Sequence, residues 1–170
     1  RDFVQRYWVG LLLLAAVAIA GSAIALRDRR VRLTVDRVLL QLPVVGRLIT
    51  DRETARFART LSTLTHNGVP LLEAVRITAG VMRNAAFAAA ATEIGERLKE
   101  GRVLSVPMVA SGLFSELAVR LTGIGEQTGQ LAAMLMQVAT IYEATLQRQL
   151  TRLMSLVTPV LTLLIGGLVG

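Results

Sequence analysis

The apolar residues of this sequence are concentrated in two runs, one toward each end of the chain. The first run covers residues 8–26 and the second covers residues 153–170, and neither contains a charged residue. A helix rises about 1.5 Å per residue, so about 20 apolar residues cross the hydrocarbon core of a bilayer. The pattern therefore predicts a transmembrane helix over each run. We expect the second helix to be truncated by the end of the sequence.

Two alternative interpretations of these runs stay open. Residues 18–20 (Ala-Ile-Ala) resemble the small-residue cleavage site of a signal peptide. However, Arg27, Arg29 and Arg30 follow the first run at once, and a basic cluster in that place favours a retained span. The second run could be a buried core helix, although its length and its lack of charge favour a membrane segment.

The sequence between the two runs shows the period of amphipathic helices and no strand pattern. Residues 27–50 are predicted to be a basic juxtamembrane linker whose amphipathic part ends at Pro43. A helical-bundle domain is expected over residues 51–152, and Asp51 is the predicted N-cap of its first helix. The predicted fold is all-α: an antiparallel bundle of about six helices in the cytoplasm, flanked by two transmembrane helices.

Apolar residues at helical spacing indicate which face of each helix meets the core. Asn84 and Ser115 are predicted N-caps, Gly101 ends a helix, and Pro107 fits the first turn of a short one. After Gly129 the pattern predicts one long helix that continues into the second span. The predicted core-facing residues, helix by helix, are Phe57, Leu61 and Leu64; Leu72, Val75 and Ala79; Phe87, Ala91, Ile94 and Leu98; Leu117, Leu121 and Ile124; and Leu131, Leu135, Val138, Tyr142 and Leu146.

Charge supports this layout and gives it an orientation. The chain has 19 Lys+Arg against 12 Asp+Glu, a net charge of +7, one His and no Cys. These counts exclude disulfides, thiol nucleophiles, iron–sulfur clusters and multi-histidine metal sites. Basic residues follow the first run and, at Arg148 and Arg152, precede the second. The positive-inside rule therefore places the bundle in the cytoplasm and residues 1–7 in an extracytoplasmic flank.

Candidate catalytic and metal-binding residues are few. Glu93, Glu96 and Glu100 share a helix face and are weak candidates for a divalent-cation site, with a solvated face paired to Arg97 and Lys99 as the other interpretation. The single His has no oriented carboxylate in the pattern, so it makes a poor catalytic base. We expect no enzyme activity, no cofactor and no catalytic residue. Nucleic-acid binding is also not expected, because the basic residues are scattered among acids without aromatic partners.

One glycine-rich element stands out at residues 123–129. It follows a predicted helix and is followed by Gln130, so it lacks the Lys and the strand of a phosphate-binding loop. The favoured interpretation is a helix–helix turn. Within it, the Glu126 carboxylate can cap a helix, bind a cation or meet an Arg of a partner.

Three segments carry a resemblance to a known family. They are LPVVGRL at 42–48, RFARTLSTLTHNGVPLLEAVRI at 56–77, and SGLFSELAVRLTGIGEQTGQLAAML at 111–135 with its Gly-Glu-x-Thr-Gly core. They resemble the type II secretion system F family, which includes general secretion pathway protein F and the inner-membrane platform proteins of type IV pili. The sequence resembles the C-terminal half, so we expect the preceding half to be missing. Residues 103–110, with Pro107, depart from the family pattern.

The resemblance implies a function without chemistry of its own. It implies a multi-pass inner-membrane platform protein that couples a cytoplasmic ATPase to assembly of pilin-like subunits. The implied partners are that ATPase, other platform components, pilin-like subunits, membrane lipid and further copies of the chain. A membrane transporter or channel subunit is the alternative. The motif positions with an implied partner or structural role are Pro43, Gly46, Phe57, Leu61, Gly68, Pro70, Leu71, Glu73, Gly112, Phe114, Gly125, Glu126, Thr128, Gly129 and Leu131.

Overall fold

Six helices make up the part of the chain that the computed structural model describes. That part comprises residue 36, residue 40 and residues 45–169, with side chains described as far as residue 151. The helices are α3 (Val45–His66), α4 (Leu71–Val81), α5 (Ala85–Lys99), α6 (Ser105–Ser111), α7 (Glu116–Thr128) and α8 (Leu131–Val169). The described residues contain no strand. The predicted all-α class and the predicted number of helices are confirmed for these residues.

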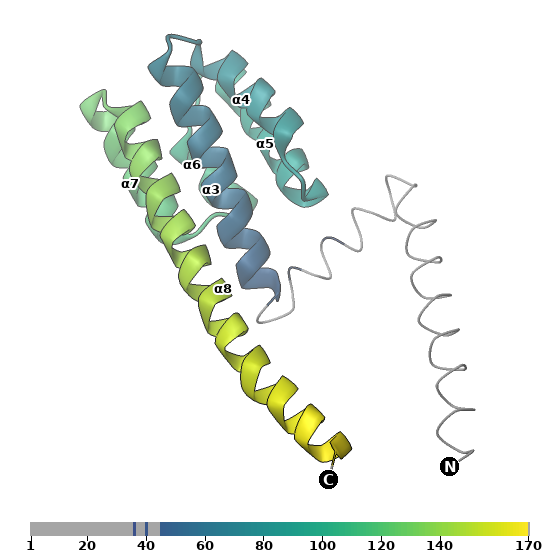
Figure 1. Cartoon of the computed structure of the whole chain (residues 1–170). Coiled ribbons are helices and arrows are strands. Elements are labelled where there is room, and N and C mark those ends of the chain that lie inside the picture. Colours follow the sequence, from purple (N-terminus) through teal and green to yellow (C-terminus); the bar gives the residue numbers. More distant parts are fainter. Residues whose placement is uncertain (1–35, 37–39, 41–44, 170) are drawn as a thin grey trace.

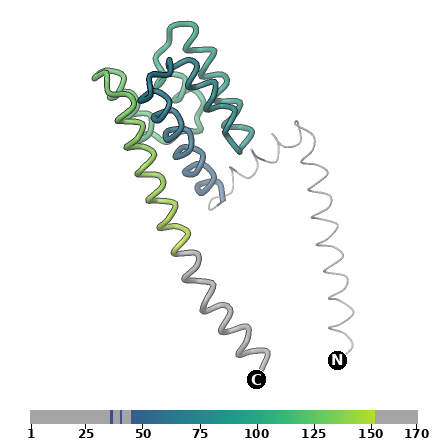
Figure 2. The backbone as a smooth tube through the Cα atoms, turned by 45° about the horizontal axis from the view of Figure 1, so that its top comes forward, coloured from purple at the N-terminus to yellow at the C-terminus, as the bar shows by residue number. Residues whose placement is uncertain are grey.

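The bundle is organised around an antiparallel pair formed by α3 and α8 (Figure 1). The α4–α5 hairpin packs against α3, α7 packs against α8, and the short α6 lies between α5 and α7. The view in Figure 2 shows α3 and the first half of α8 side by side again. α8 continues without interruption beyond the bundle to Val169, as the prediction of one long helix required.

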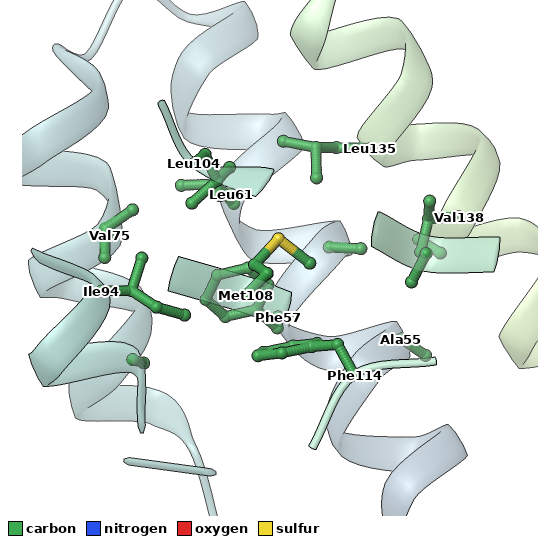
Figure 3. Packing of buried hydrophobic residues seen from close by; sticks show 14 of the residues in the cluster. Ala55, Phe57, Leu61, Val75, Ile94, Leu104, Met108, Phe114, Leu135 and Val138 are labelled. Carbon is green, nitrogen blue, oxygen red and sulfur yellow. The ribbon is translucent and has the colours of Figure 1, made fainter. Parts of the chain in front are cut away.

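Aromatic and aliphatic side chains from all six helices fill the core. The ring centroids of Phe57 and Phe114 are 4.9 Å apart, and those of Phe87 and Phe114 are 5.4 Å apart. Figure 3 shows the side chains of α3, α5, α6 and α8 converging on this cluster. Burying a side chain of this size contributes about 1.5–3 kcal/mol each. The other large, fully buried apolar side chains are Leu61, Val75, Ile94, Leu104, Met108, Leu135 and Val138.

Several local predictions are confirmed. Asn84 Oδ1 accepts hydrogen bonds from the amides at the start of α5, and Ser115 Oγ accepts one from the Ala118 amide of α7. Gly101 follows α5 with φ +83°, a conformation that favours glycine. Pro107 is the third residue of α6, where a missing backbone N–H leaves no helical bond unmade.

The start of the first helix was predicted wrongly. α3 begins at Val45, so Asp51 lies inside the helix, where it accepts a hydrogen bond from Gln149 Nε2 at 3.0 Å instead of capping. Gly46 is the second residue of α3 and is buried. A Cβ added there would stand 2.2 Å from the Leu40 carbonyl oxygen, so this glycine permits close packing at the start of α3.

Three residues predicted to face the core are exposed, one on α4 and two on α7, whereas Val75 is buried and Ala79 and Leu121 pack against the core as predicted. Leu72 is 39% exposed, and Leu117 and Ile124 are 46% and 48% exposed. The core-facing side of each of these two helices also carries small residues and a threonine. The hydroxyls of Thr78 and Thr122 donate to the carbonyl four residues earlier, which satisfies them while the helices pack closely. The buried residues are Ala74, Val75 and Thr78 on α4, and Ala118, Thr122 and Gly125 on α7.

Neither predicted membrane span is covered by the described side chains. Residues 8–26 lie outside the described residues, and residues 153–170 fall where no side chain is described. Among the described residues, no helix has both the length and the apolarity to cross a membrane. Both spans therefore stay predictions.

Candidate functional site: motif residues and exposed grooves

The Glu126 carboxylate binds backbone amides at the start of α6. Its two oxygens accept hydrogen bonds from the amides of Leu104 and Ser105, the second at 3.2 Å. The first amides of a helix have no partner within the helix, and a carboxylate there also opposes the positive end of the helix dipole. Of the three roles considered for Glu126, the structure shows the first: this residue of α7 caps the start of α6.

A second carboxylate, that of Glu53, binds backbone amides of the α4–α5 turn. The sequence did not lead us to predict this site. Glu53 Oε2 accepts hydrogen bonds from the amides of Arg83 at 2.9 Å and Asn84 at 3.3 Å, and its Oε1 accepts one from Arg56 Nη1 at 2.6 Å. Glu53 is 2% exposed. It lies four residues before Phe57 on the same buried stripe, and this position was the available signal.

A third acceptor completes the start of α5. Asp36 Oδ2 accepts a hydrogen bond from the Ala85 amide at 2.7 Å. The amides of residues 83–87 are thus all bound by side-chain oxygens of Glu53, Asp36 and Asn84. Because unpaired buried amides are costly, these three acceptors hold the turn in one conformation.

The other residues of the Gly-Glu-x-Thr-Gly core lie in the last turn of α7 and directly after it. The turn predicted over residues 123–129 is therefore wrong in its extent, because residues 123–128 are helical and only Gly129 and Gln130 connect α7 to α8. A Cβ on Gly125 would stand 2.9 Å from Leu131 Cα and from Met134 Cβ, so only glycine lets the two helices approach. Gly129 ends α7 with φ +69°. Thr128 is exposed and its hydroxyl donates to the Ile124 carbonyl at 2.8 Å, and Leu131 packs against the core.

The motif residues of α3 and α4 also have structural places. Phe57 and Leu61 lie in the core, and Leu71 packs against it. Gly68 has φ +80° in the connecting turn, and the exposed Glu73 carboxylate pairs with Arg76 at 2.8 Å. Pro70 is the residue before α4.

Around the α6–α7 turn, Gly112 has φ +64° and Phe114 fills the core. Pro43 lies outside the described residues. The predicted motif residues that the structure describes therefore sit at turns, helix ends and core positions.

Polar contacts join α3 and α8 along their length. Arg59 Nε donates to Glu143 Oε1 at 3.0 Å, and its Nη2 donates to the other oxygen. This hydrogen bond raises the pKa of the Arg59 guanidinium above its ordinary value. Ser62 Oγ donates to the Ala132 carbonyl at 2.6 Å. The pair is therefore fixed in register by polar contacts as well as by the core.

The three candidate metal ligands lie on the exposed face of α5 beside basic residues. Arg97 pairs with Glu93 at 3.5 Å and with Glu100 at 3.3 Å, and Lys99 pairs with Glu96 at 2.8 Å. These hydrogen bonds and charges raise the pKa of Arg97. Among the residues described, no group of three acidic or His side chains is placed to hold a metal ion.

An open groove of about 760 Å³ separates α5 from α6. Its walls are mainly small and apolar, with Ala86, Ala90 and Pro107 among them, and Arg97 and Arg102 line it too. Leu40 also lines the groove. A shallower depression between α6 and α7 is lined by Val106, Val109 and Ile124, each about half exposed or more. The bundle thus presents apolar surface on both sides of α6.

Comparison with known proteins gives consistent matches. The family described as "Type II secretion system (T2SS), protein F" matches residues 57–170. The type IV pilus assembly protein PilC of Pseudomonas aeruginosa is 32% identical over 170 residues, covering 99% of this chain and 46% of that protein. The type II secretion system protein F of the same organism is 34% identical, covering 99% and 42%. The type 4 fimbrial assembly protein PilC of Pseudomonas putida is 37% identical, covering 94% and 40%. The chain spans less than half the length of these relatives.

Proposed function

Because the chain belongs to the type II secretion system protein F family, we propose that it is part of the inner-membrane platform of a type II secretion or type IV pilus machine. The similarity over residues 57–170 carries this proposal. Relatives named for protein secretion and relatives named for pilus assembly match this chain about equally well. We therefore propose the platform role without assigning the chain to one of the two machines.

The platform acts by binding and moving other proteins and catalyses no reaction itself. The placement of Glu126 supports this, because its carboxylate is occupied by the amides of α6. The described motif residues likewise serve turns and packing. A packed helical bundle moves as a rigid body when one of its faces is displaced, since close-packed cores do not deform continuously.

Motion is proposed to pass from a cytoplasmic ATPase through the bundle to pilin-like subunits at the membrane. α8 is the physical link, because one helix runs from the bundle core at Leu135 to Val169. Residues 153–169 of that helix carry no charge, which supports a place in the bilayer for this segment. Further copies of the chain and other platform proteins are the proposed partners at the apolar surface around α6.

The test is site-specific photocrosslinking of the full-length protein in cells that contain the whole machine. Crosslinkers replace Arg76 and Arg97, which are exposed on α4 and α5, and a matched control replaces the buried Ile94. We expect ATPase crosslinks from at least one exposed position and none from Ile94. ATP hydrolysis by the purified full-length protein alone would overturn the proposal.

A further inference from the structure

The arginines of the bundle are unevenly distributed between its two ends. At the end where α3 begins and α8 leaves, Arg47, Arg52 and Arg148 are exposed, and none has an ion pair with any residue that the structure describes. At the opposite end, residues 63–74 and 125–135 contain no Arg or Lys, and their acidic residues are Glu73 and Glu126. Three exposed arginines without a described ion pair therefore lie at the end where α3 begins and α8 leaves.

The three arginines lie at the same end of the bundle because α3 and α8 are antiparallel. The hydrogen bond from Gln149 to Asp51 puts the neighbours of these two residues, Arg148 and Arg52, at the same level of the bundle. Arg47 lies five residues earlier on α3, about 7.5 Å along the helix axis. Among the described residues, neither nearby acid forms an ion pair with them: Asp51 accepts a hydrogen bond from Gln149, and Glu53 is buried against Arg56.

We propose that this arginine cluster, Arg47, Arg52 and Arg148, binds the headgroups of anionic phospholipids. α8 continues from Arg148 into the uncharged residues 153–169, so a membrane-inserted α8 brings the cluster to the bilayer surface. A guanidinium binds phosphate oxygens with two N–H donors and stays charged at any physiological pH. The inference rests on the membrane placement in the proposed function and names the lipid class that the bundle contacts.

A nucleic acid fits this end less well than a lipid surface. Residues 45–56 and 146–151 contain no aromatic side chain on which a base could stack. Basic residues beside a membrane segment attract anionic lipids over a distance set by the Debye length, about 8–10 Å at physiological salt. Arg148 lies five residues before the uncharged residues 153–169, about 7.5 Å along α8 and so within one such length.

The test compares lipid preference in the full chain reconstituted in vesicles. The cluster variant is R47Q/R52Q/R148Q. The control R76Q/R97Q/R120Q removes three exposed, ion-paired arginines and so has the same net charge. Spin-labelled phosphatidylglycerol and phosphatidylcholine are each added, and the fraction immobilised by the protein is measured. Circular dichroism checks that both variants stay helical.

We expect the unmodified chain to prefer phosphatidylglycerol by about fivefold at low salt, and we expect 0.5 M NaCl to reduce this preference. The cluster variant should lose at least about two-thirds of the preference, and the control should keep most of it. Equal loss in both variants, or no preference in the unmodified chain, overturns the assignment. Tight DNA binding that the cluster variant alone loses would also overturn it.

The same vesicles separate this inference from the proposed function. If alkaline carbonate washes the chain from the vesicles, the membrane placement fails, and lipid preference is then still measured by cosedimentation at neutral pH. If the chain resists carbonate but shows no preference, the arginine cluster fails as a lipid site while the platform role stands.

Discussion

The α4–α5 turn and the start of α6 solve the same problem in different surroundings. In each, a glutamate from another helix accepts hydrogen bonds from two successive amides that have no helical partner. Glu53 is 2% exposed and is also paired with Arg56, whereas Glu126 is only partly buried and has no ion pair within the described residues. Asp36 and Asn84 reinforce the first site, and neither has a counterpart at the second.

This difference in burial indicates which of the two regions is the more rigid. A buried carboxylate is stable only when its charge and lone pairs are met, so Glu53 and its partners form or fail as a unit. Water can replace the partners of Glu126 in part, so the start of α6 should open more easily. α6, which carries exposed apolar surface, is therefore expected to be the more mobile of the two regions.

The largest effect is expected for Glu53→Ala. The change leaves two amides and Arg56 without their partner, which should lower the free energy of unfolding by about 3–5 kcal/mol. Urea unfolding followed by circular dichroism in detergent measures this loss. Glu96→Ala is the control. This exposed carboxylate pairs with Lys99, so the substitution should cost about 0.5 kcal/mol or less. Similar losses in the two variants would contradict the comparison.

The next effect is expected for Gly125→Ala, beside Glu126. The new Cβ would stand 2.9 Å from Leu131 Cα, so α7 and α8 must separate, at a cost of about 1–3 kcal/mol. Gly80→Ala is the matched control. A Cβ there has open space within a helix, so this change should stabilise the protein by about 0.5–1 kcal/mol. Opposite signs of the two changes in melting temperature are the expected result.

A smaller effect is expected for Glu126→Gln. The amide oxygen keeps one acceptor for the start of α6 but loses the charge, so the expected cost is about 1 kcal/mol. Hydrogen exchange should accelerate at Leu104 and Ser105 and change little at residues 83–87. If exchange rises equally at both turns, the two regions are not independent and the comparison fails.

The smallest effect is expected at the ion pair of Arg59 and Glu143. Both side chains are about 40% exposed, so a double-mutant cycle with Arg59→Gln and Glu143→Gln should give a coupling of about 0.2–1 kcal/mol that falls at high salt. A coupling as large as the loss in Glu53→Ala would show that burial is not what distinguishes Glu53.

Local signals in the sequence predicted much of this fold. Asn84, Ser115 and Gly101 were assigned correctly because caps and left-handed residues depend on a few neighbours. The outward-facing Leu117 and Ile124 were assigned to the core because hydrophobicity alone does not reveal that Ala118, Thr122 and Gly125 permit closer packing. A contact between helices decides such a face, and the pattern within one helix does not contain it.

The candidate site shows the same limit. Glu126 was singled out because a glycine-rich turn surrounds it, and helix capping was among its expected roles. Glu53 was missed, because a charged residue is ordinarily assigned to solvent, and its partners at residues 83 and 84 are 30 and 31 positions away. For Glu93, Glu96 and Glu100, the structure shows the second interpretation, a solvated face paired to Arg97 and Lys99. Those pairs follow from spacing within one helix, so the sequence could predict them.

α8 runs without a break from the bundle to Val169, so it sets the rotation of residues 150–169 about the helix axis relative to the bundle. Each residue of a helix adds about 100° of rotation and 1.5 Å of length. One residue inserted after Gln149 would therefore rotate the residues that follow by more than a quarter circle, while lengthening α8 very little. The number of residues between Tyr142 and the uncharged run thus sets which side of the distal segment faces a neighbour.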